Sequence, residues 1–296
     1  VTLWLGNSQL HAITQYHEGD QTAALLLHKD LKKFDIYTLT LSQANSNLQE
    51  HYLLLAYLLE HFPIQTLVLP VVFDDLREDD IRHTIEDVLS NQYLISRISK
   101  SNTGKNLISK FNNKNSNIIV TDRKDDLSQD IFENLLDKKL NKFWSIWSNR
   151  ENLRGSLFAK LYYLRNSIFG ITPSTTRKMI PGRYAKNISA FKDILKLSLE
   201  NKLEVLIYIP PIRNDIKIPY NLDDYKNFKI EIENITKKNN YRFISLENIV
   251  PPEFWGEKAS TNLKKEKEVD FMHFQSNGHR ILAKSLFLEL VKLLDK

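Results

Sequence analysis

The feature that most limits the fold of this 296-residue chain is an alternation of short apolar runs with longer segments of helical period. Apolar runs of this length suit strands that are buried on both faces of a sheet, and the periodic segments suit helices that cover it. We expect strands at residues 1–5, 36–41, 65–72, 204–210 and 241–245, and helices at residues 48–62, 185–201, 223–239 and 277–295. This alternation predicts an α/β fold with a parallel sheet.

A long gap separates the third and fourth predicted strands. The chain from residue 72 to residue 204 is far longer than the roughly 30 residues of a βαβ unit. We therefore expect a single domain over residues 1–296 with a helical insertion or cap at about residues 76–184. Residues 99–117 are polar and rich in asparagine, which is typical of a mobile surface stretch. Residues 143–170 interleave aromatic and basic side chains, which favours a small cap, with a surface for a membrane or a partner as the alternative.

Composition excludes several classes of function. The chain has no cysteine, which rules out zinc-thiolate sites, Fe–S clusters, disulfides and a cysteine nucleophile. Its net charge of +5 comes from 41 basic and 36 acidic residues spread along the chain, so we do not expect nucleic acid as a partner. The longest apolar run, residues 52–59, is far below the roughly 20 residues of a membrane span. Because the chain starts directly with a strand, we expect that a tag, signal peptide or membrane anchor preceded it.

The first predicted strand ends in the sequence GNSQ, residues 6–9. Ligands of parallel α/β sheets bind at the carboxyl ends of strands, where Gly6 permits a tight turn and Ser8 lies at the start of a helix. Two roles are open for Ser8. It is either a helix N-cap or a nucleophile whose own N–H helps to hold an oxyanion.

A nucleophilic serine needs a base, and the best candidate lies near the far end of the chain, in VDFMHFQSNGHRILA. An amphipathic helix follows Ser276, so we expect Asp270 and His273 in the loop before it. Their spacing lets the carboxylate accept the imidazole Nδ1–H and leaves Nε2 to take the serine proton. His11 is nearer in sequence but aims poorly at Ser8. The alternative is that Asp270 and His273 are solvated loop residues.

Together, GNSQ and DFMHFQSNGHRILA resemble the first and last blocks of the SGNH/GDSL hydrolase superfamily. The residues Ser8, Asp270 and His273 match the family's catalytic residues, and Gly278, His279 and Ala283 complete the trailing pattern. The resemblance implies a three-layer sandwich with a parallel, flavodoxin-like five-stranded sheet and a helical insertion. It also implies a Ser-His-Asp triad that uses neither a metal nor a cofactor.

The middle blocks depart from the family pattern. After the second strand, LTLSQANSN has no oxyanion-hole glycine, so we expect the N–H of Ser8 and a backbone N–H of Gln43 or Ala44 to form the hole. After the third strand, LPVVFDDLRED lacks the asparagine donor of the family's Gly-x-Asn-Asp run. Either Arg77 or Arg213 is a candidate for the missing contact, with a solvated surface charge as the alternative. The full set of expected substrate-binding residues is Asn7, Gln9, Asn45, Arg77 and Arg213.

The stretches PVVFDD and IYIPPIRND resemble the branch that contains alginate- and teichoic-acid-modifying proteins, including the D-alanyl transfer protein of lipoteichoic acid synthesis. This resemblance implies an extracytoplasmic protein, periplasmic or membrane-anchored, whose substrate is an acylated glycan or polymer and whose partner is a membrane-bound O-acyltransferase. We predict a serine esterase or O-acyltransferase. The alternative is a non-catalytic SGNH-fold protein that binds a polymer or docks on the acyltransferase.

Overall fold

The computed structural model describes residues 1–79, 81–121, 175–258 and 267–294. The chain divides into two compact units. One unit holds Val1–Asn106, Ser174–Lys258 and Glu268–Lys296, and the other holds Leu107–Pro173 and Ala259–Lys267. The sheet and the candidate site belong to the first unit.

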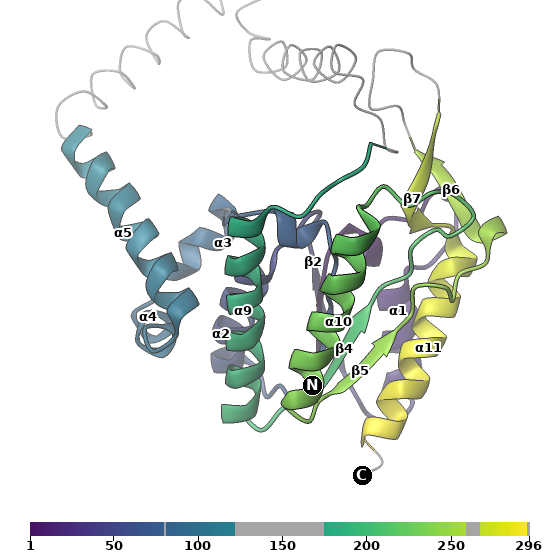
Figure 1. The fold of residues 1–296 in the computed structure, drawn as a ribbon. Helices are drawn as coiled ribbons and strands as arrows, with labels where there is room; N and C mark the ends of the chain where they lie inside the picture. The colour runs from purple at the N-terminus through teal and green to yellow at the C-terminus, as the bar shows by residue number, and fades with distance from the viewer. Residues whose placement is uncertain (80, 122–174, 259–266, 295–296) are drawn as a thin grey trace, which may run out of the picture. The chain divides into compact units, whose positions relative to one another are not determined.

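A sheet of five parallel strands forms the centre of this first unit (Figure 1). The strands lie in the order β2-β1-β3-β4-β5, which is the flavodoxin-like order. They are β1 (Thr2–Gly6), β2 (Thr38–Ser42), β3 (Thr66–Pro70), β4 (Glu204–Ile209) and β5 (Arg242–Ser245). The five-stranded α/β prediction is therefore confirmed. The strand order reverses between β1 and β3, and ligands of such sheets bind beside that switch point, at the carboxyl ends of the strands.

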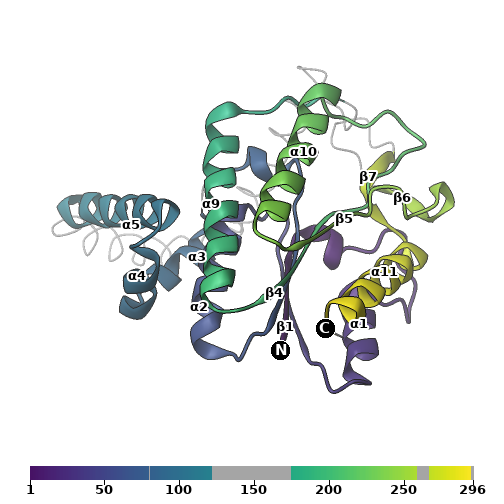
Figure 2. The same cartoon turned by 60° about the horizontal axis from the view of Figure 1, so that its bottom comes forward.

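Helices cover both faces of the sheet, so the unit has three layers (Figure 2). One face carries α1 (Ala23–Lys32) and α11 (Ser276–Leu294), and the other carries α2 (Leu48–His61), α9 (Pro181–Glu200) and α10 (Leu222–Lys238). Trp4, Val68 and Tyr208 pack in one core cluster with the apolar residues of α1 and α11. Because side chains alternate along a strand, Leu3 and Leu67 point to the opposite layer. Helix α1 was not among the helices predicted from the sequence.

The start of the predicted insertion forms short helices after β3. They are η2 (Asp75–Arg77), α3 (His83–Glu86), η3 (Asp87–Ser90) and α4 (Gln92–Ile98), and α5 (Asn102–Thr121) follows them. Helix α5 contains most of the stretch predicted to be a mobile surface segment, because apolar residues such as Leu107 and Phe111 recur at helical spacing among its asparagines. The aromatic and basic stretch at residues 143–170 lies outside the described part of the chain. None of the helices that the structure describes is long and apolar enough to cross a membrane.

A small antiparallel hairpin of β6 (Trp255–Lys258) and β7 (Glu268–Phe274) completes the first unit. Asp270 and His273 lie on β7 and not in a loop, which corrects the sequence prediction. The strand exists because β6 pairs with it, and the rings of Trp255 and Phe274 meet edge to face with centroids 5.4 Å apart.

Candidate active site

Three side chains from opposite ends of the chain form a continuous hydrogen-bonded row. The Ser8 Oγ lies 2.8 Å from His273 Nε2, and His273 Nδ1 lies 2.9 Å from Asp270 Oδ2. The Asp270 side chain is 3% exposed, whereas the His273 side chain is 24% exposed. With the Nδ1–H donating to the carboxylate, Nε2 is left to accept the Ser8 O–H. The structure thus brings together the three residues that the sequence predicts to act together.

Asp270 is held in place by bonds to its own strand. Its Oδ1 accepts the backbone N–H of Met272 at 2.9 Å and that of His273 at 3.0 Å. Burial raises the pKa of the Asp270 carboxyl, but the His273 imidazole and the two backbone N–H groups outweigh burial and hold the pKa below its ordinary value. The carboxylate is therefore ionised and fixes both the orientation and the tautomer of His273.

The turn that carries Ser8 is a short 3-10 helix, η1 (Ser8–Leu10), which directly follows β1. Its N-cap is Asn7, whose Oδ1 accepts the Gln9 N–H at 3.1 Å, so Ser8 does not serve as the cap. The Asn7 Nδ2 donates to Asp75 Oδ2 at 2.9 Å. A Cβ on Gly6 would lie 2.3 Å from the Leu10 side chain, which explains the glycine before the turn.

Gln9 ties the Ser8 turn to two other segments. Its Nε2 donates to the Pro211 carbonyl at 2.8 Å, after β4, and to the Met272 carbonyl at 2.7 Å, on β7. The Gln9 side chain thus joins the serine turn to the strand that carries His273. Its Oε1 is buried and has no hydrogen-bond partner within the described ranges.

The oxyanion side of Ser8 differs from the prediction at one residue. The Gln43 N–H donates to the Gly6 carbonyl at 3.2 Å, so the sheet occupies this amide and it is not a donor to the hole. No hydrogen bond within the described part of the chain engages the N–H of Ser8 or of Ala44. Of the three predicted donors, the Ser8 and Ala44 amides are therefore the two left for an oxyanion hole.

Two aspartates follow β3 where the family pattern has an asparagine. Asp75 is 6% exposed, and burial raises the pKa of its carboxyl well above the ordinary range. Asp74 accepts Arg77 Nη1 at 3.2 Å and the Tyr220 hydroxyl at 3.1 Å, and it also contacts Arg177. The loop after β3 is thus bound into the protein by its own charges.

The predicted substrate-binding residues are mostly engaged within the protein. The Arg77 Nε donates to the Lys178 carbonyl at 2.9 Å, and Arg213 binds both carboxylate oxygens of Asp215 at 2.7 and 2.9 Å. Asn7 and Gln9 are occupied as described above. Asn45 alone of this set has an exposed side chain without a hydrogen bond inside the described ranges. Contact of these residues with a substrate stays a prediction.

Two further histidines lie near the site. His11 Nδ1 lies 2.9 Å from Ser42 Oγ, and burial together with the nearby His273 lowers the His11 pKa. His279 is fully buried, accepts the Ala23 N–H at Nδ1 and donates from Nε2 to the Ala12 carbonyl, each at 3.1 Å. Burial lowers the pKa of His279 to about 4. His279 belongs to the trailing pattern of the sequence, but no feature of the sequence predicts its bonds to Ala12 and Ala23.

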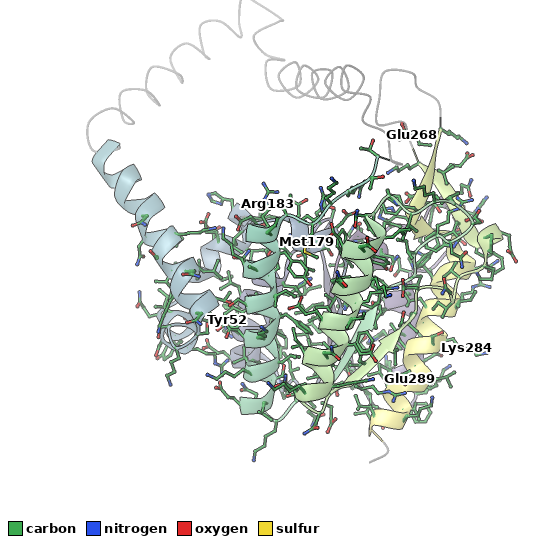
Figure 3. All side chains as sticks on the ribbon, in the orientation of Figure 1. Tyr52, Met179, Arg183, Glu268, Lys284 and Glu289 are labelled. Carbon is green, nitrogen blue, oxygen red and sulfur yellow. The ribbon has the colours of Figure 1, made fainter. Side chains whose placement is uncertain are left out.

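Side chains at the carboxyl-terminal edge of the sheet are mixed in charge. Arg183 and Glu268 both lie at this edge in the view of Figure 3, whereas Glu289 on α11 lies toward the opposite edge.

Within the described residues, no group of three or more His, Cys, Asp or Glu side chains could hold a metal ion.

No protein-family model and no curated protein matches the chain. Among solved structures, it is similar to a presumed acylhydrolase of Bacteroides fragilis, with a TM-score of 0.42 and 10% identity over 99% of this chain and 87% of that one. It is also similar to a presumed GDSL-like lipase of Parabacteroides merdae, with a TM-score of 0.42 and 9% identity over 99% of this chain and 95% of that one. Both likenesses are too distant to bear on function, which must be argued from the site.

Proposed function

We propose that the chain is a serine-dependent acyl esterase or O-acyltransferase. The observation that carries this proposal is the row from Ser8 Oγ through His273 to the buried Asp270, with separations of 2.8 and 2.9 Å. A serine, a histidine and an ionised carboxylate in this order are the parts that acyl transfer through a serine requires. The row also lies beside the switch point of the sheet, where ligands of this fold bind.

The mechanism follows from these positions. His273 Nε2 takes the Ser8 proton as Ser8 Oγ bonds to the acyl carbonyl carbon, and the carbonyl electron pair moves onto oxygen. The N–H groups of Ser8 and Ala44 stabilise this oxyanion. When the carbonyl re-forms, the bond to the leaving alkoxide breaks, and the alkoxide takes the proton from His273. Water or a sugar hydroxyl, deprotonated by His273, then attacks the acyl carbon, the bond to Ser8 Oγ breaks, and Ser8 Oγ takes the proton back from His273.

We further propose that the substrate is an ester of a cell-surface glycan or polymer, that the chain acts outside the cytoplasmic membrane, and that a membrane-bound O-acyltransferase is its partner. This part rests on the resemblance of PVVFDD and IYIPPIRND to the polymer-modifying branch. Asn45, with its exposed side chain beside Ala44, is the first residue we assign to substrate contact.

A second candidate function is a non-catalytic protein that binds a polymer or docks on the acyltransferase. It is favoured by the occupied Gln43 amide and by the absence of an asparagine after β3. The intact triad favours the enzyme, because a binding protein needs no proton relay to a serine.

A fluorophosphonate probe separates the two functions. We expect the wild-type chain to be labelled, and labelling to be lost in Ser8→Ala and in His273→Ala. Ser99→Ala is the matched control, because the Ser99 hydroxyl donates to the Ser96 carbonyl and stays outside the site. Absence of labelling in folded wild-type protein would support the binding protein. With an acetylated oligosaccharide, release of acetate indicates hydrolysis and acetylation of an added acceptor indicates transfer.

A further inference from the structure

Arg82 binds the turn that follows β2 from the side of the insertion. This residue is the N-cap of α3, and it lies in the segment that follows β3. Its Nη1 donates to Gln43 Oε1 at 2.8 Å, and its Nη2 donates to the Ala44 carbonyl. One guanidinium therefore contacts both the side chain and the backbone of the turn that carries the candidate oxyanion amide.

A buried carboxylate holds Arg82 in place. Glu50 Oε1 accepts the Arg82 backbone N–H at 3.0 Å and lies 3.5 Å from its Nε. Glu50 Oε2 accepts the Ser46 hydroxyl at 3.1 Å and the Asn47 N–H at 3.2 Å. The Glu50 side chain is 1% exposed, and a charge so buried needs a partner of opposite sign. The nearby His51 does not compete for this role, because burial and the Arg82 charge lower its pKa to about 3.

The turn itself needs such support. The Ser46 N–H donates to the Gln43 carbonyl at 3.3 Å, and Asn45 has a φ of +55°, the positive value that a type II turn requires at its third residue. Rotation of the Ala44–Asn45 peptide would convert this turn into another type. The bond from Arg82 to the Ala44 carbonyl fixes that peptide in one orientation. The Ala44 N–H belongs to the preceding peptide, whose Gln43 carbonyl accepts the Ser46 N–H, so Arg82 orients this N–H by holding the turn as a whole, through the Ala44 carbonyl and the Gln43 side chain.

The turn also lies next to the nucleophile. Ser42 is in register with Gly6, and the Gln43 N–H bonds to the Gly6 carbonyl, two residues before Ser8. Because the loop after β3 offers no asparagine amide, the second donor of the hole depends on this turn.

We propose that Arg82, anchored by Glu50, is a positioning residue that holds the Gln43–Ser46 turn so that the Ala44 N–H complements the Ser8 N–H at the oxyanion. This inference rests on the proposed function. It means that a residue near the start of the predicted insertion affects catalysis by orienting a donor of the oxyanion hole. Arg82 acts through the turn and does not itself contact the reacting atoms.

The test compares Arg82→Met, Arg82→Lys and the matched control Arg97→Met. Arg97 also donates to a backbone carbonyl, that of Ala56 at 2.9 Å on α2. Tyr52, on the same helix, lies lower in Figure 3 than Arg183 and Glu268, which mark the carboxyl-terminal edge of the sheet. Each variant is assayed for kcat and KM on an ester and for inhibition by a boronic acid, whose tetrahedral adduct needs the oxyanion hole.

We expect Arg82→Met to lower kcat and boronate affinity by about 10- to 100-fold with little change in KM, because loss of one oxyanion donor costs about 10²- to 10³-fold and here the donor is displaced rather than removed. Arg82→Lys recovers part of both quantities, since lysine keeps the charge but not the fork. Arg97→Met stays at wild-type values. A change in thermal stability alone, with kcat and boronate affinity unchanged, would overturn the inference.

The outcomes also separate this inference from the proposed function. If Ser8 is labelled by the fluorophosphonate and folded Arg82→Met keeps wild-type kcat, the inference fails and the proposed function stands. If wild-type protein is neither labelled nor active, the proposed function fails. Should Arg82→Met not fold, Gln43→Met decides, because it removes only the acceptor of Nη1. A smaller fall in kcat and boronate affinity supports the inference, and wild-type values overturn it.

Discussion

The two sides of Ser8 are built to different degrees of completeness. On the base side, all four polar side-chain atoms of Asp270 and His273 have partners, and His279 and Gln9 bind the neighbouring backbone. On the oxyanion side, the sheet occupies the Gln43 amide, and two aspartates stand after β3 where the family pattern has an asparagine donor followed by an aspartate. The first side is fixed by a strand and its carboxylate, and the second by a turn that Arg82 and Glu50 hold.

In the proposed mechanism, this difference separates two steps of catalysis. Proton removal from Ser8 depends on groups that are already oriented, so it needs no help from the substrate. In the proposed hole, two amides stabilise the oxyanion, and one of them lies in a turn whose two central residues, Ala44 and Asn45, are exposed. The site is therefore expected to be selective for esters that bring additional contacts, and variants on the two sides test that expectation.

The largest effect is expected on the base side, for Asp270→Asn. The amide would keep the backbone bonds but present an N–H to His273 Nδ1 and favour the wrong tautomer, which costs roughly 10⁴-fold in kcat in serine enzymes. The measurement is kcat on an activated ester. Asp193→Asn, which removes a carboxylate that accepts the Thr103 N–H, is the control. Activity near the wild-type level in Asp270→Asn would show that His273 is not oriented through Asp270.

A smaller effect is expected on the oxyanion side. It is a difference in rate between two substrates of the wild-type chain. A hole short of one donor loses about 3 kcal/mol of transition-state stabilisation, or about 10²-fold in rate. We expect kcat/KM for p-nitrophenyl acetate to lie about 10²-fold below that for an acylated oligosaccharide, although its leaving group is better. Equal or faster hydrolysis of p-nitrophenyl acetate would mean that the hole is complete without the substrate.

His279 tests the base side through stability rather than rate. Its pKa is lowered to about 4 by burial, so the folded chain keeps it neutral while the unfolded chain takes up a proton below about pH 6.5. Stability is therefore lost as pH falls from about 6.5 to about 4, on the order of 3 kcal/mol from this residue. His279→Gln can keep both bonds without titrating. Urea unfolding at pH 7 and pH 4.5 should show a smaller loss in the variant, and an equal loss would contradict the assignment.

Much of the sheet could be predicted from the sequence because its signal is local. β1, β3 and β4 are apolar runs, β1 and β3 are buried along their whole length, and β2 alternates threonine with leucine. The pairing of Ser8 with Asp270 and His273 was also predictable, because the motifs at the two ends of the chain carry their own spacing. What the sequence could not show are contacts made by partners far apart along the chain.

Three residues illustrate this limit. The sequence predicts Asp270 in a loop. The residue lies on β7 instead, because this segment becomes a strand through its pairing with β6. Gln43 was expected to donate to the hole, but the parallel register of β1 and β2 brings the Gly6 carbonyl within reach of its N–H. Arg82 has no motif at all, and its role follows from the buried Glu50 and the turn it contacts.

Asp75→Asn gives the smallest expected effect and bears most directly on the oxyanion side. Because burial raises the pKa of Asp75, the folded chain holds this proton at pH values where the unfolded chain has released it, and stability falls as pH rises above about 4. An asparagine can accept the Asn7 Nδ2–H as Asp75 does, but it carries no charge to bury. We expect Tm at pH 7 to rise by about 2–4 °C, equivalent to about 1 kcal/mol, with no difference at pH 3.5. A gain of the same size at both pH values would show that the carboxyl proton is not its cause. The same variant adds an amide beside the Ser8 turn, so an accompanying rise in p-nitrophenyl acetate hydrolysis would show that a side-chain donor at this residue completes the hole.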